Sequence, residues 1–556
     1  MKWTVLICLC LSTPVFNAEY PQVRISDGIL NGAFMTTRNN RKISGFTKIP
    51  YAKPPVGKLR FEAPVPNDPW VEERNATGVH AECPQNDIFA FNEIKGEEDC
   101  LYLNVYTPKL SDFENGLLPV MFWIHGGALL CGSGNLKYYG PDVLLDKDIV
   151  LVSINYRLGP LGYAATGDDV VPGNNGFKDQ TMALKWVKKN IAKFGGNPDQ
   201  ITIFGQSAGG GSTNIHLVSP LSRGLFSRSI SQSGSSMCPW LLSVNDQTIK
   251  NTHKLAKDFN CPTDSSRNMV DCLKNVDFQK IIEQAKSYVV WDYDPVIPFR
   301  PVIEPKSTKN PFLTDRPIDI IKSGEAMDVP VILGFTSNDG GFKVAGFDDK
   351  MVKEFSEQFD EIAPVSLLYY YEKDSKTLTN KIKEMYFPNK PINNSLKEIG
   401  DLFTDRWFFK CAEDFSRLRA KYYKQPVYLY MFSYKAKTST SKLIMQRDED
   451  YGVIHWDDLQ HLFPIGPGIS TESDKKMDRV MTTLWTNFAK TGNPTPEISD
   501  LIPNKWSPFT LENEEYFHIG NSVLDTTTRV FPERSEFWRS LNDPLKEIAN
   551  ELKDEL

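Results

Sequence analysis

The sequence lacks the features that would divide it or mark a protein for nucleic acid. It has no Gly/Ser-rich or Pro-rich low-complexity segment, no block of like charges and no internal repeat, which favours one large domain over a repeat array or linked modules. A net charge of -7 spread over 556 residues provides no basic surface for nucleic acid. After the first residues, no uninterrupted apolar run is long enough to cross a bilayer. We therefore expect small-molecule partners, no nucleic acid and no membrane span.

The two ends of the chain resemble targeting signals. A basic start followed by the apolar run 5–16 is typical of a secretory signal peptide, with cleavage near Ala18. The last four residues, Lys-Asp-Glu-Leu, form an address that a receptor reads to return proteins to the endoplasmic reticulum. The sequence predicts a signal peptide over 1–18, a single domain over 19–552 and a retention tetrapeptide over 553–556. The retrieval receptor is then a partner, the lumen of the endoplasmic reticulum is the predicted location, and secretion is the alternative.

The cysteines and two glycosylation tripeptides are compatible with that compartment. Of the nine cysteines, Cys8 and Cys10 leave with the signal peptide. Two pairs that are close in sequence are candidate disulfides, although sequence alone does not fix the pairing: Cys83 with Cys100, and Cys261 with Cys272. Three cysteines are expected to remain as thiols that act as small buried apolar residues: Cys131, Cys238 and Cys411. Candidate N-glycosylation sites are Asn75 and Asn393.

Short apolar segments alternate with helical patterns along the chain. Apolar positions on one face predict a helix over 179–194, which Gly195-Gly196 ends. The segments that read as buried strands are 120–124, 149–154, 201–204, 229–231 and 331–333. This alternation predicts an α/β fold with a mostly parallel sheet flanked by helices, in which ligands bind at the carboxyl ends of the strands.

The pentapeptide Gly205-Gln206-Ser207-Ala208-Gly209 follows one of these strands and opens a helical stretch. A serine is a poor nucleophile unless a sharp strand-to-helix turn exposes it beside a base, and the flanking glycines remove the Cβ atoms that such a turn would crowd. Ser207 is therefore a candidate nucleophile.

The strand 120–124 runs directly into His125-Gly126-Gly127. Glycines let consecutive N–H groups point at one place, where each donor stabilises the oxyanion of acyl transfer by roughly 2.7–4 kcal/mol. We assign the N–H groups of Gly126, Gly127 and Ala208 to an oxyanion hole; the alternative is an ordinary glycine-rich turn.

A nucleophilic serine needs a base and an acid, and the chain has only seven histidines. Because the order in such hydrolases is serine, acid, histidine, the base should lie far downstream. His455 is the first choice, and His461 and His518 are its competitors. Asp339 lies in a Gly-flanked turn after the strand 331–333 and is the candidate acid, although an aspartate before glycine also commonly bonds its own backbone.

At this point the residues resemble the type B carboxylesterase family, which includes cholinesterases, insect carboxylesterases and juvenile hormone esterases. The motifs that carry the resemblance span nearly the whole predicted domain: Arg60-Phe61, Glu98 to Asn104, Asn155 to Gly159, Gly173-Asn174, Asp179-Gln180, Phe204 to Gly210 and Gln232-Ser233-Gly234. The resemblance implies an α/β-hydrolase fold with a deep apolar gorge and the triad Ser207, Asp339 and His455. It further implies a supporting hydrogen bond from Ser233, a salt bridge between Arg60 and Glu98, and the two disulfides named above.

The departures from the family pattern bear on the substrate. The acid of the family is more often Glu, and Asp339 is shorter than Glu by one methylene. No tryptophan lies between Cys83 and Cys100, where cholinesterases hold a quaternary ammonium, so acetylcholine is an unlikely preferred substrate. Trp240 resembles an acyl-pocket residue, with a core tryptophan as the alternative.

The sequence thus predicts a serine hydrolase that cleaves carboxylic esters through an acyl-enzyme, without a metal or cofactor. The resemblance is closest to a general insect carboxylesterase, in particular to venom-gland carboxylesterases. Gln206 favours a juvenile hormone esterase as the alternative substrate class. A catalytically inactive adhesion or binding homologue is the alternative of another class.

Overall fold

The structure, a computed structural model, describes residues 20–88, 93–110, 116–444, 446, 448–465 and 471–545. The predicted signal peptide and the C-terminal tetrapeptide lie outside these residues. Within them, no helix is long and apolar enough to cross a membrane.

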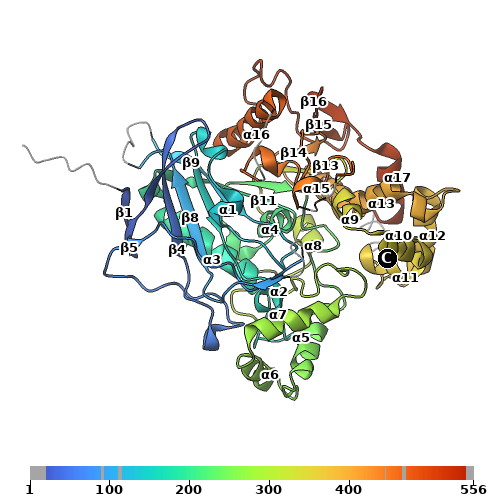
Figure 1. Cartoon of the computed structure of the whole chain (residues 1–556), viewed down its shortest axis with the longest axis horizontal. Helices are drawn as coiled ribbons and strands as arrows, with labels where there is room; N and C mark the ends of the chain where they lie inside the picture. Colours follow the sequence, from blue (N-terminus) through green and yellow to red (C-terminus); the bar gives the residue numbers. More distant parts are fainter. Residues whose placement is uncertain are drawn as a thin grey trace, which may run out of the picture.

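An 11-stranded sheet forms the centre of the molecule, in the order β16-β15-β14-β13-β12-β11-β9-β10-β8-β4-β3 (Figure 1). Neighbours from β10 to β15 in this order are parallel, and the strands at both ends are antiparallel. The strands are β3 (Ala33–Thr36), β4 (Lys42–Pro50), β8 (Tyr102–Thr107), β9 (Leu118–Ile124), β10 (Val150–Ile154), β11 (Gly196–Gln206), β12 (Arg228–Gln232), β13 (Val331–Thr336), β14 (Val427–Phe432), β15 (Glu515–Ile519) and β16 (Leu524–Thr528). Two small sheets are formed by β1 (Gln22–Ile25), β2 (Gly28–Asn31) and β5 (Arg74–Asn75), and by β6 (Gln85–Asp87) and β7 (Glu93–Lys95).

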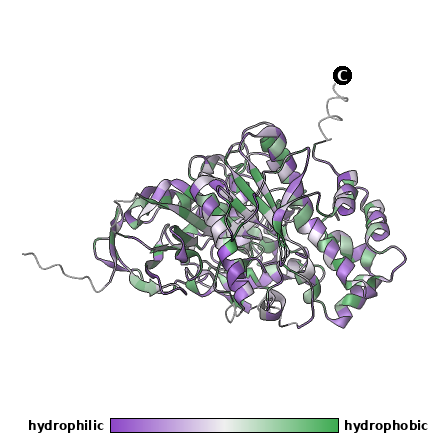
Figure 2. Ribbon diagram, turned by 90° about the horizontal axis from the view of Figure 1, so that it is seen from above, coloured by the Kyte–Doolittle hydropathy of each residue, from purple (hydrophilic) through white to green (hydrophobic). Residues whose placement is uncertain are grey.

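Figure 2 shows mainly hydrophobic strands at the centre of the molecule, with helices of mixed hydropathy around them. The helices are α1 (Leu136–Tyr139), α2 (Gly159–Tyr163), α3 (Asn175–Asn190), α4 (Ala208–His216), α5 (Gln247–Asp258), α6 (Ser266–Leu273), α7 (Phe278–Ala285), α8 (Pro317–Lys322), α9 (Gly341–Ala345), α10 (Asp349–Glu357), α11 (Phe359–Ser366), α12 (Ser375–Tyr386), α13 (Leu396–Thr404), α14 (Lys410–Tyr422), α15 (Thr440–Ile444), α16 (Glu472–Thr491) and α17 (Pro532–Leu541). A π-helix, Asp405–Phe409, joins α13 to α14. Helices α5 to α7 form a group below the sheet in Figure 1, and α10 to α13 form another at its right.

The predicted fold class is confirmed. All five predicted segments occur as strands, and β10 and β13 are buried along their whole length, as parallel strands covered on both faces should be. The predicted helix begins four residues earlier than expected, at Asn175, and its last part is a 3-10 helix, Ile191–Phe194, that ends at Gly195 with φ of +82°. The left-handed conformation there suits glycine, which explains where the helix ends.

The structure corrects one expectation about the cysteines. Disulfides join Cys83 to Cys100 and Cys261 to Cys272, as the resemblance implies. Cys238 and Cys411, expected as free thiols, form a third disulfide, and only Cys131 is a free buried thiol among the described residues. Closeness in sequence could not reveal the third pair because 173 positions separate its two members. The three disulfides indicate an oxidising compartment and therefore the secretory pathway.

Candidate active site

Ser207 lies at a sharp turn between β11 and α4. Its φ of +59° and ψ of -126° are unusual for a residue with a side chain, and such strain is found preferentially at functional sites. The flanking glycines permit the turn: a Cβ at Gly205 would lie 2.6 Å from the carbonyl oxygen of Ile124, and one at Gly209 would lie 2.1 Å from the same atom. The Ser207 N–H donates to the carbonyl of Gln232 at 2.8 Å. The turn is thereby fixed to the carboxyl end of the neighbouring strand.

Asp339 follows the end of β13 and is fully buried. Its Oδ2 accepts hydrogen bonds from the Thr336 N–H and the Ser233 hydroxyl, both at 2.9 Å. Its Oδ1 lies 2.6 Å from Nδ1 of His455. A buried carboxylate is costly unless it is hydrogen-bonded, and these donors meet that need while directing Oδ1 at the histidine.

His455 is held from its edge and from its faces. With Nδ1 bonded to Asp339, the neutral ring presents Nε2 as a proton acceptor, which is the arrangement a general base requires. The ring stacks on Phe408, with centroids 4.6 Å apart, and packs against Phe342 at 5.0 Å. Neither phenylalanine was predicted from the sequence, although the position of Phe342 three residues after Asp339 could have suggested it.

Gln206 encloses the same ring from another side. Its amide nitrogen lies 3.0 Å from Nε2 and 3.3 Å from Nδ1 of His455. An in-plane atom this close to both nitrogens would collide with the carbon between them, so the amide lies over the ring face. Among the described residues, Ser207 and His455 share no hydrogen bond; such bonds are often long before substrate is bound.

The competing histidines have other partners. His461 is fully buried, and its Nδ1 lies 2.7 Å from Oδ1 of Asp478. His518 is half-buried, and its Nε2 lies 2.5 Å from the Ser433 hydroxyl. Within the described residues, only His455 pairs with Asp339.

Two of the three assigned oxyanion donors lie directly beside Ser207: Gly126 in space and Ala208 in the chain. A Cβ at Gly126 would lie 3.0 Å from the Ser207 Cβ, so this backbone passes directly beside the serine. Gly127 has φ of +105°, and a Cβ there would lie 2.1 Å from a carbonyl oxygen of the same loop. Ala208 opens α4, where N–H groups of the first turn have no partner within the helix. The glycine loop therefore passes beside Ser207 at Gly126, and α4 begins directly after it, as the predicted oxyanion hole requires.

His125 supports this loop from inside the protein. Its Nδ1 lies 2.7 Å from the carbonyl oxygen of Gly126, and its ring stacks on Tyr156 at 4.4 Å. The Tyr156 hydroxyl donates to the His125 carbonyl at 2.8 Å. Burial lowers the pKa of His125 to about 4, so its imidazole is neutral at physiological pH.

Trp240 packs against α4 at Gly211. Its indole N–H donates to the carbonyl of Trp407 in the π-helix at 2.8 Å, and its ring lies 6.5 Å from that of Phe408. A Cβ at Gly211, one turn after Ser207, would lie 3.2 Å from the Trp240 ring. Trp240 is thus buried between the helix of the serine and the segment that contacts His455.

A buried carboxylate lies near the pair of Asp339 and His455. Asp458 accepts hydrogen bonds from the Gln232 amide at 2.8 Å and from the Tyr430 hydroxyl at 3.0 Å. Burial raises the pKa of Asp458 to about 6, and the negative charge of Asp339 acts in the same direction.

A cavity of about 540 Å³ opens beside the glycine loop. Its lining includes Gly126, Gly127, Tyr138, Tyr139, Trp456 and Leu459. At its charged side, Lys95 pairs with Glu82 at 3.2 Å and with Asp87 at 2.9 Å. Ser207 and His455 are not among the residues that line this cavity, which reaches the site at the glycine loop. Its apolar wall of Tyr138, Tyr139 and Trp456 suits a neutral organic group.

The salt bridge implied for Arg60 and Glu98 is present, with nitrogen–oxygen distances of 2.5 and 2.6 Å. Arg60 also donates to the carbonyl of Val276 at 2.5 Å. Since neither residue contacts the triad, the bridge has a structural role.

Comparisons with known proteins give one family. The model of the carboxylesterase family matches residues 19–538. A venom carboxylesterase-6 of Apis mellifera is 40% identical over 540 residues, covering 94% of each chain. A juvenile hormone esterase of Tribolium castaneum is 37% identical over 529 residues, covering 91% of this chain and 88% of the other. The crystal structure of juvenile hormone esterase from Manduca sexta, with OTFP covalently attached, aligns with a TM-score of 0.84 at 28% identity, covering 94% of this chain and 99% of the other.

Proposed function

The chain belongs to the carboxylesterase family and is a serine hydrolase of carboxylic esters, and on this premise we propose that Ser207, His455 and Asp339 form its catalytic triad. The observation that carries the proposal is the buried contact of 2.6 Å between Asp339 Oδ1 and His455 Nδ1, across from the turn of Ser207. Triad function requires this orientation of the imidazole, because the acid holds the tautomer that accepts the serine proton.

The proposed reaction has two halves. His455 Nε2 takes the hydroxyl proton as Ser207 attacks the ester carbonyl, and the N–H groups of Gly126, Gly127 and Ala208 stabilise the oxyanion. The tetrahedral intermediate collapses, the alcohol leaves with the proton from His455, and an acyl-enzyme remains. Water, deprotonated by His455, then attacks the acyl group and releases the carboxylate and the free serine.

Replacement of Ser207 by alanine tests the nucleophile. Loss of the nucleophile from such a triad lowers turnover on the order of a million-fold. We expect Ser207→Ala to fold with the thermal stability of the parent and to lose hydrolysis of a short aryl ester to that extent. Retention of most of the activity would refute the assignment.

For the substrate, we favour a general carboxylesterase acting on small neutral esters. Support comes from the apolar wall of the cavity beside the glycine loop and from Trp240, a bulky side chain buried against the helix that follows Ser207. A juvenile hormone esterase is the second candidate because Gln206 lies against His455 and two of the similar proteins are juvenile hormone esterases. The ratio of kcat/KM for aryl butyrates to kcat/KM for juvenile hormone distinguishes the two candidates. A ratio well above one supports the general carboxylesterase, and a ratio well below one supports the juvenile hormone esterase.

We also propose that the protein is glycosylated and retained in the lumen of the endoplasmic reticulum. Asn75 and Asn393 are exposed, and the Thr77 hydroxyl donates to the Asn75 side chain at 2.6 Å. Retained glycoproteins keep high-mannose glycans, so endoglycosidase H should remove the glycans of the native protein. Complex glycans on protein recovered mainly outside cells would refute retention by the last four residues.

A further inference from the structure

We propose that the Cys238–Cys411 disulfide positions the acyl side of the active site by holding the segment Ser233–Trp240 against the π-helix Asp405–Phe409. The inference rests on the triad proposed above. It assigns a role in substrate selectivity to a disulfide that contacts no reacting atom, so both cysteines are positioning residues.

The first of the two segments contacts the catalytic acid at its start and the helix that follows Ser207 at its end. At its start, the Ser233 hydroxyl donates to Asp339 at 2.9 Å. At its end, Trp240 packs against Gly211 in the helix that follows Ser207. A shift of this segment would therefore move the partner of the catalytic acid and the ring beside the nucleophile's helix.

The second segment touches the base. Phe408, in the π-helix, stacks on the His455 ring with centroids 4.6 Å apart. The carbonyl of Trp407 accepts the indole N–H of Trp240 at 2.8 Å. A carbonyl oxygen has two lone pairs, so that of Trp407 can accept the indole N–H in addition to a bond within its own helix. The two segments thus fix the Trp240 ring, which packs on α4, relative to the Phe408 ring, which stacks on His455.

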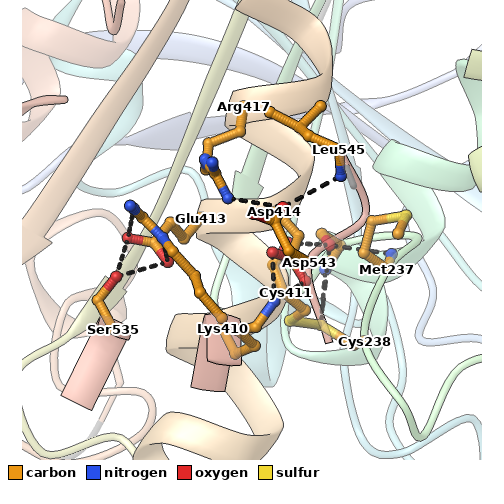
Figure 3. A network of polar contacts seen from close by, with 12 residues as sticks. Met237, Cys238, Lys410, Cys411, Glu413, Asp414, Arg417, Ser535, Asp543 and Leu545 are labelled. Carbon is orange, nitrogen blue, oxygen red and sulfur yellow. Dashed lines mark hydrogen bonds and ion pairs between the residues drawn. A yellow bond between two sulfur atoms is a disulfide. The ribbon is translucent and has the colours of Figure 1, made fainter. Parts of the chain in front are cut away.

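The disulfide is the covalent part of a tight junction between these segments (Figure 3). The Ser235 hydroxyl donates to the carbonyl of Cys411 at 3.0 Å and accepts from the Met237 N–H at 3.0 Å. Cys238 and Cys411 are both buried, with 3% and 2% of their surfaces exposed. Without the disulfide, the junction would still contain the hydrogen bond from Ser235 to the carbonyl of Cys411 and the one from Trp240 to the carbonyl of Trp407.

The π-helix side of the junction is anchored to the C-terminal part of the chain. Figure 3 shows Glu413, in α14, beside Ser535, whose hydroxyl donates to it at 2.7 Å. Arg539 pairs with the same carboxylate at 2.5 Å, and Arg417 pairs with Asp543 at 3.0 Å. Since α14 is held by these contacts, a bond to Cys411 ties the segment of Trp240 to a fixed element.

The test compares two double variants, each lacking one disulfide. In Cys238→Ala/Cys411→Ala, the junction loosens, and Trp240 can move to leave room for longer acyl groups. The ratio of kcat/KM for an aryl hexanoate to that for the aryl acetate should therefore rise about tenfold. One methylene in an apolar pocket is worth roughly 10- to 200-fold in discrimination, so a partial relaxation over four methylenes can supply this change.

The matched control is Cys261→Ala/Cys272→Ala, which removes the disulfide near α5 and α6, where neither cysteine contacts a triad residue. It should lose thermal stability and keep the parent's ratio within twofold. Concentrations of active sites are measured by organophosphate titration, so that unfolded enzyme does not enter kcat. An unchanged ratio in the first variant, or an equal shift in both, overturns the proposal.

A single variant covers the case in which the first double variant does not fold. Ser235→Ala removes the hydrogen bond to Cys411 and leaves the disulfide intact; we expect its hexanoate-to-acetate ratio to rise at least threefold. An unchanged ratio there overturns the proposal. Ser207→Ala distinguishes failure of the triad proposal from failure of the disulfide proposal. If Ser207→Ala keeps its activity, the triad is wrong. If it is inactive and the hexanoate-to-acetate ratio does not shift in the disulfide and Ser235 variants, only the role of the disulfide is wrong.

Discussion

Removal of the Ser233 hydroxyl should slow catalysis without weakening substrate binding. Ser233 donates to Asp339 Oδ2 at 2.9 Å in a fully buried environment, and Asp339 in turn holds His455. In Ser233→Ala, the carboxylate keeps the donors from Thr336 and His455 but loses its side-chain hydroxyl partner. The lost bond matters most when His455 becomes positively charged, because the carboxylate then stabilises the imidazolium.

The size of the effect follows from the kind of bond that is lost. A hydrogen bond to a charged group contributes about 1.5–3 kcal/mol. At about 1.4 kcal/mol for each factor of ten, loss of the whole amount from the transition state lowers kcat by about 10- to 150-fold. KM should change little because Ser233 does not face the substrate.

The assay measures kcat and KM for a short aryl ester in Ser233→Ala and in the control Ser231→Ala. Ser231 is also buried in β12, but its hydroxyl lies 2.8 Å from that of Thr213 and not near Asp339. We expect the control to keep kcat within about threefold, since a neutral hydrogen bond contributes about 1 kcal/mol and here it affects only stability. A rise in KM with kcat unchanged, or an equal loss of kcat in both variants, would refute the reasoning.

Three further changes test other parts of the structure. Gly127→Ala should abolish hydrolysis, since the φ of Gly127 is +105° and the added Cβ would lie 2.1 Å from a carbonyl oxygen. The control Gly224→Ala has φ of +75° but open space around the added Cβ. It should lose only about 1 kcal/mol of stability in thermal unfolding and no activity. Because burial raises the pKa of Asp458 from 3.8 to about 6, the carboxyl group favours the folded state fully below pH 3.8, and this contribution is lost as the pH rises through 6. The stability of Asp458→Asn relative to the parent should therefore rise by about 2 kcal/mol between pH 4 and pH 7 in denaturant unfolding, and a constant difference would contradict this. Loop-closure entropy predicts that loss of the Cys238–Cys411 disulfide, whose cysteines are 173 positions apart, lowers the free energy of unfolding by about 5 kcal/mol. Loss of the Cys261–Cys272 disulfide, with a separation of 11, should lower it by about 3 kcal/mol. Denaturant unfolding measures both values, and a reversed order would refute the estimate.

The parts of the site that could be predicted from the sequence are those encoded in short segments. The turn of Ser207 and the loop of Gly126 depend on neighbouring glycines and on the strand just before them, so both patterns are visible in a few residues. Five of the buried strands were equally visible because parallel strands covered on both faces are continuous apolar runs, whereas the buried strands β8 and β14 were not predicted. Strand β16 was not predicted; its sequence Leu-Asp-Thr-Thr-Thr is polar and partly exposed at the sheet edge.

The parts that could not be predicted depend on contacts between distant segments. Chain order left His455, His461 and His518 open, and the distinction came from their partners: His461 pairs with Asp478, whereas His455 reaches Asp339. The packing of Phe408 on His455 depends on a π-helix that has no simple sequence pattern. The Cys238–Cys411 disulfide was missed for the same reason, since only the folded chain brings its cysteines together.

Covalent labelling of the purified protein with a fluorophosphonate tests the central claim, that Ser207 is the activated nucleophile, most directly. Peptide mass spectrometry should find one adduct per molecule, on Ser207, and the fraction labelled should equal the fraction of esterase activity lost. His455→Ala should prevent the labelling because the serine then lacks its base. An adduct on another residue, or full activity after Ser207 is completely labelled, would contradict the account.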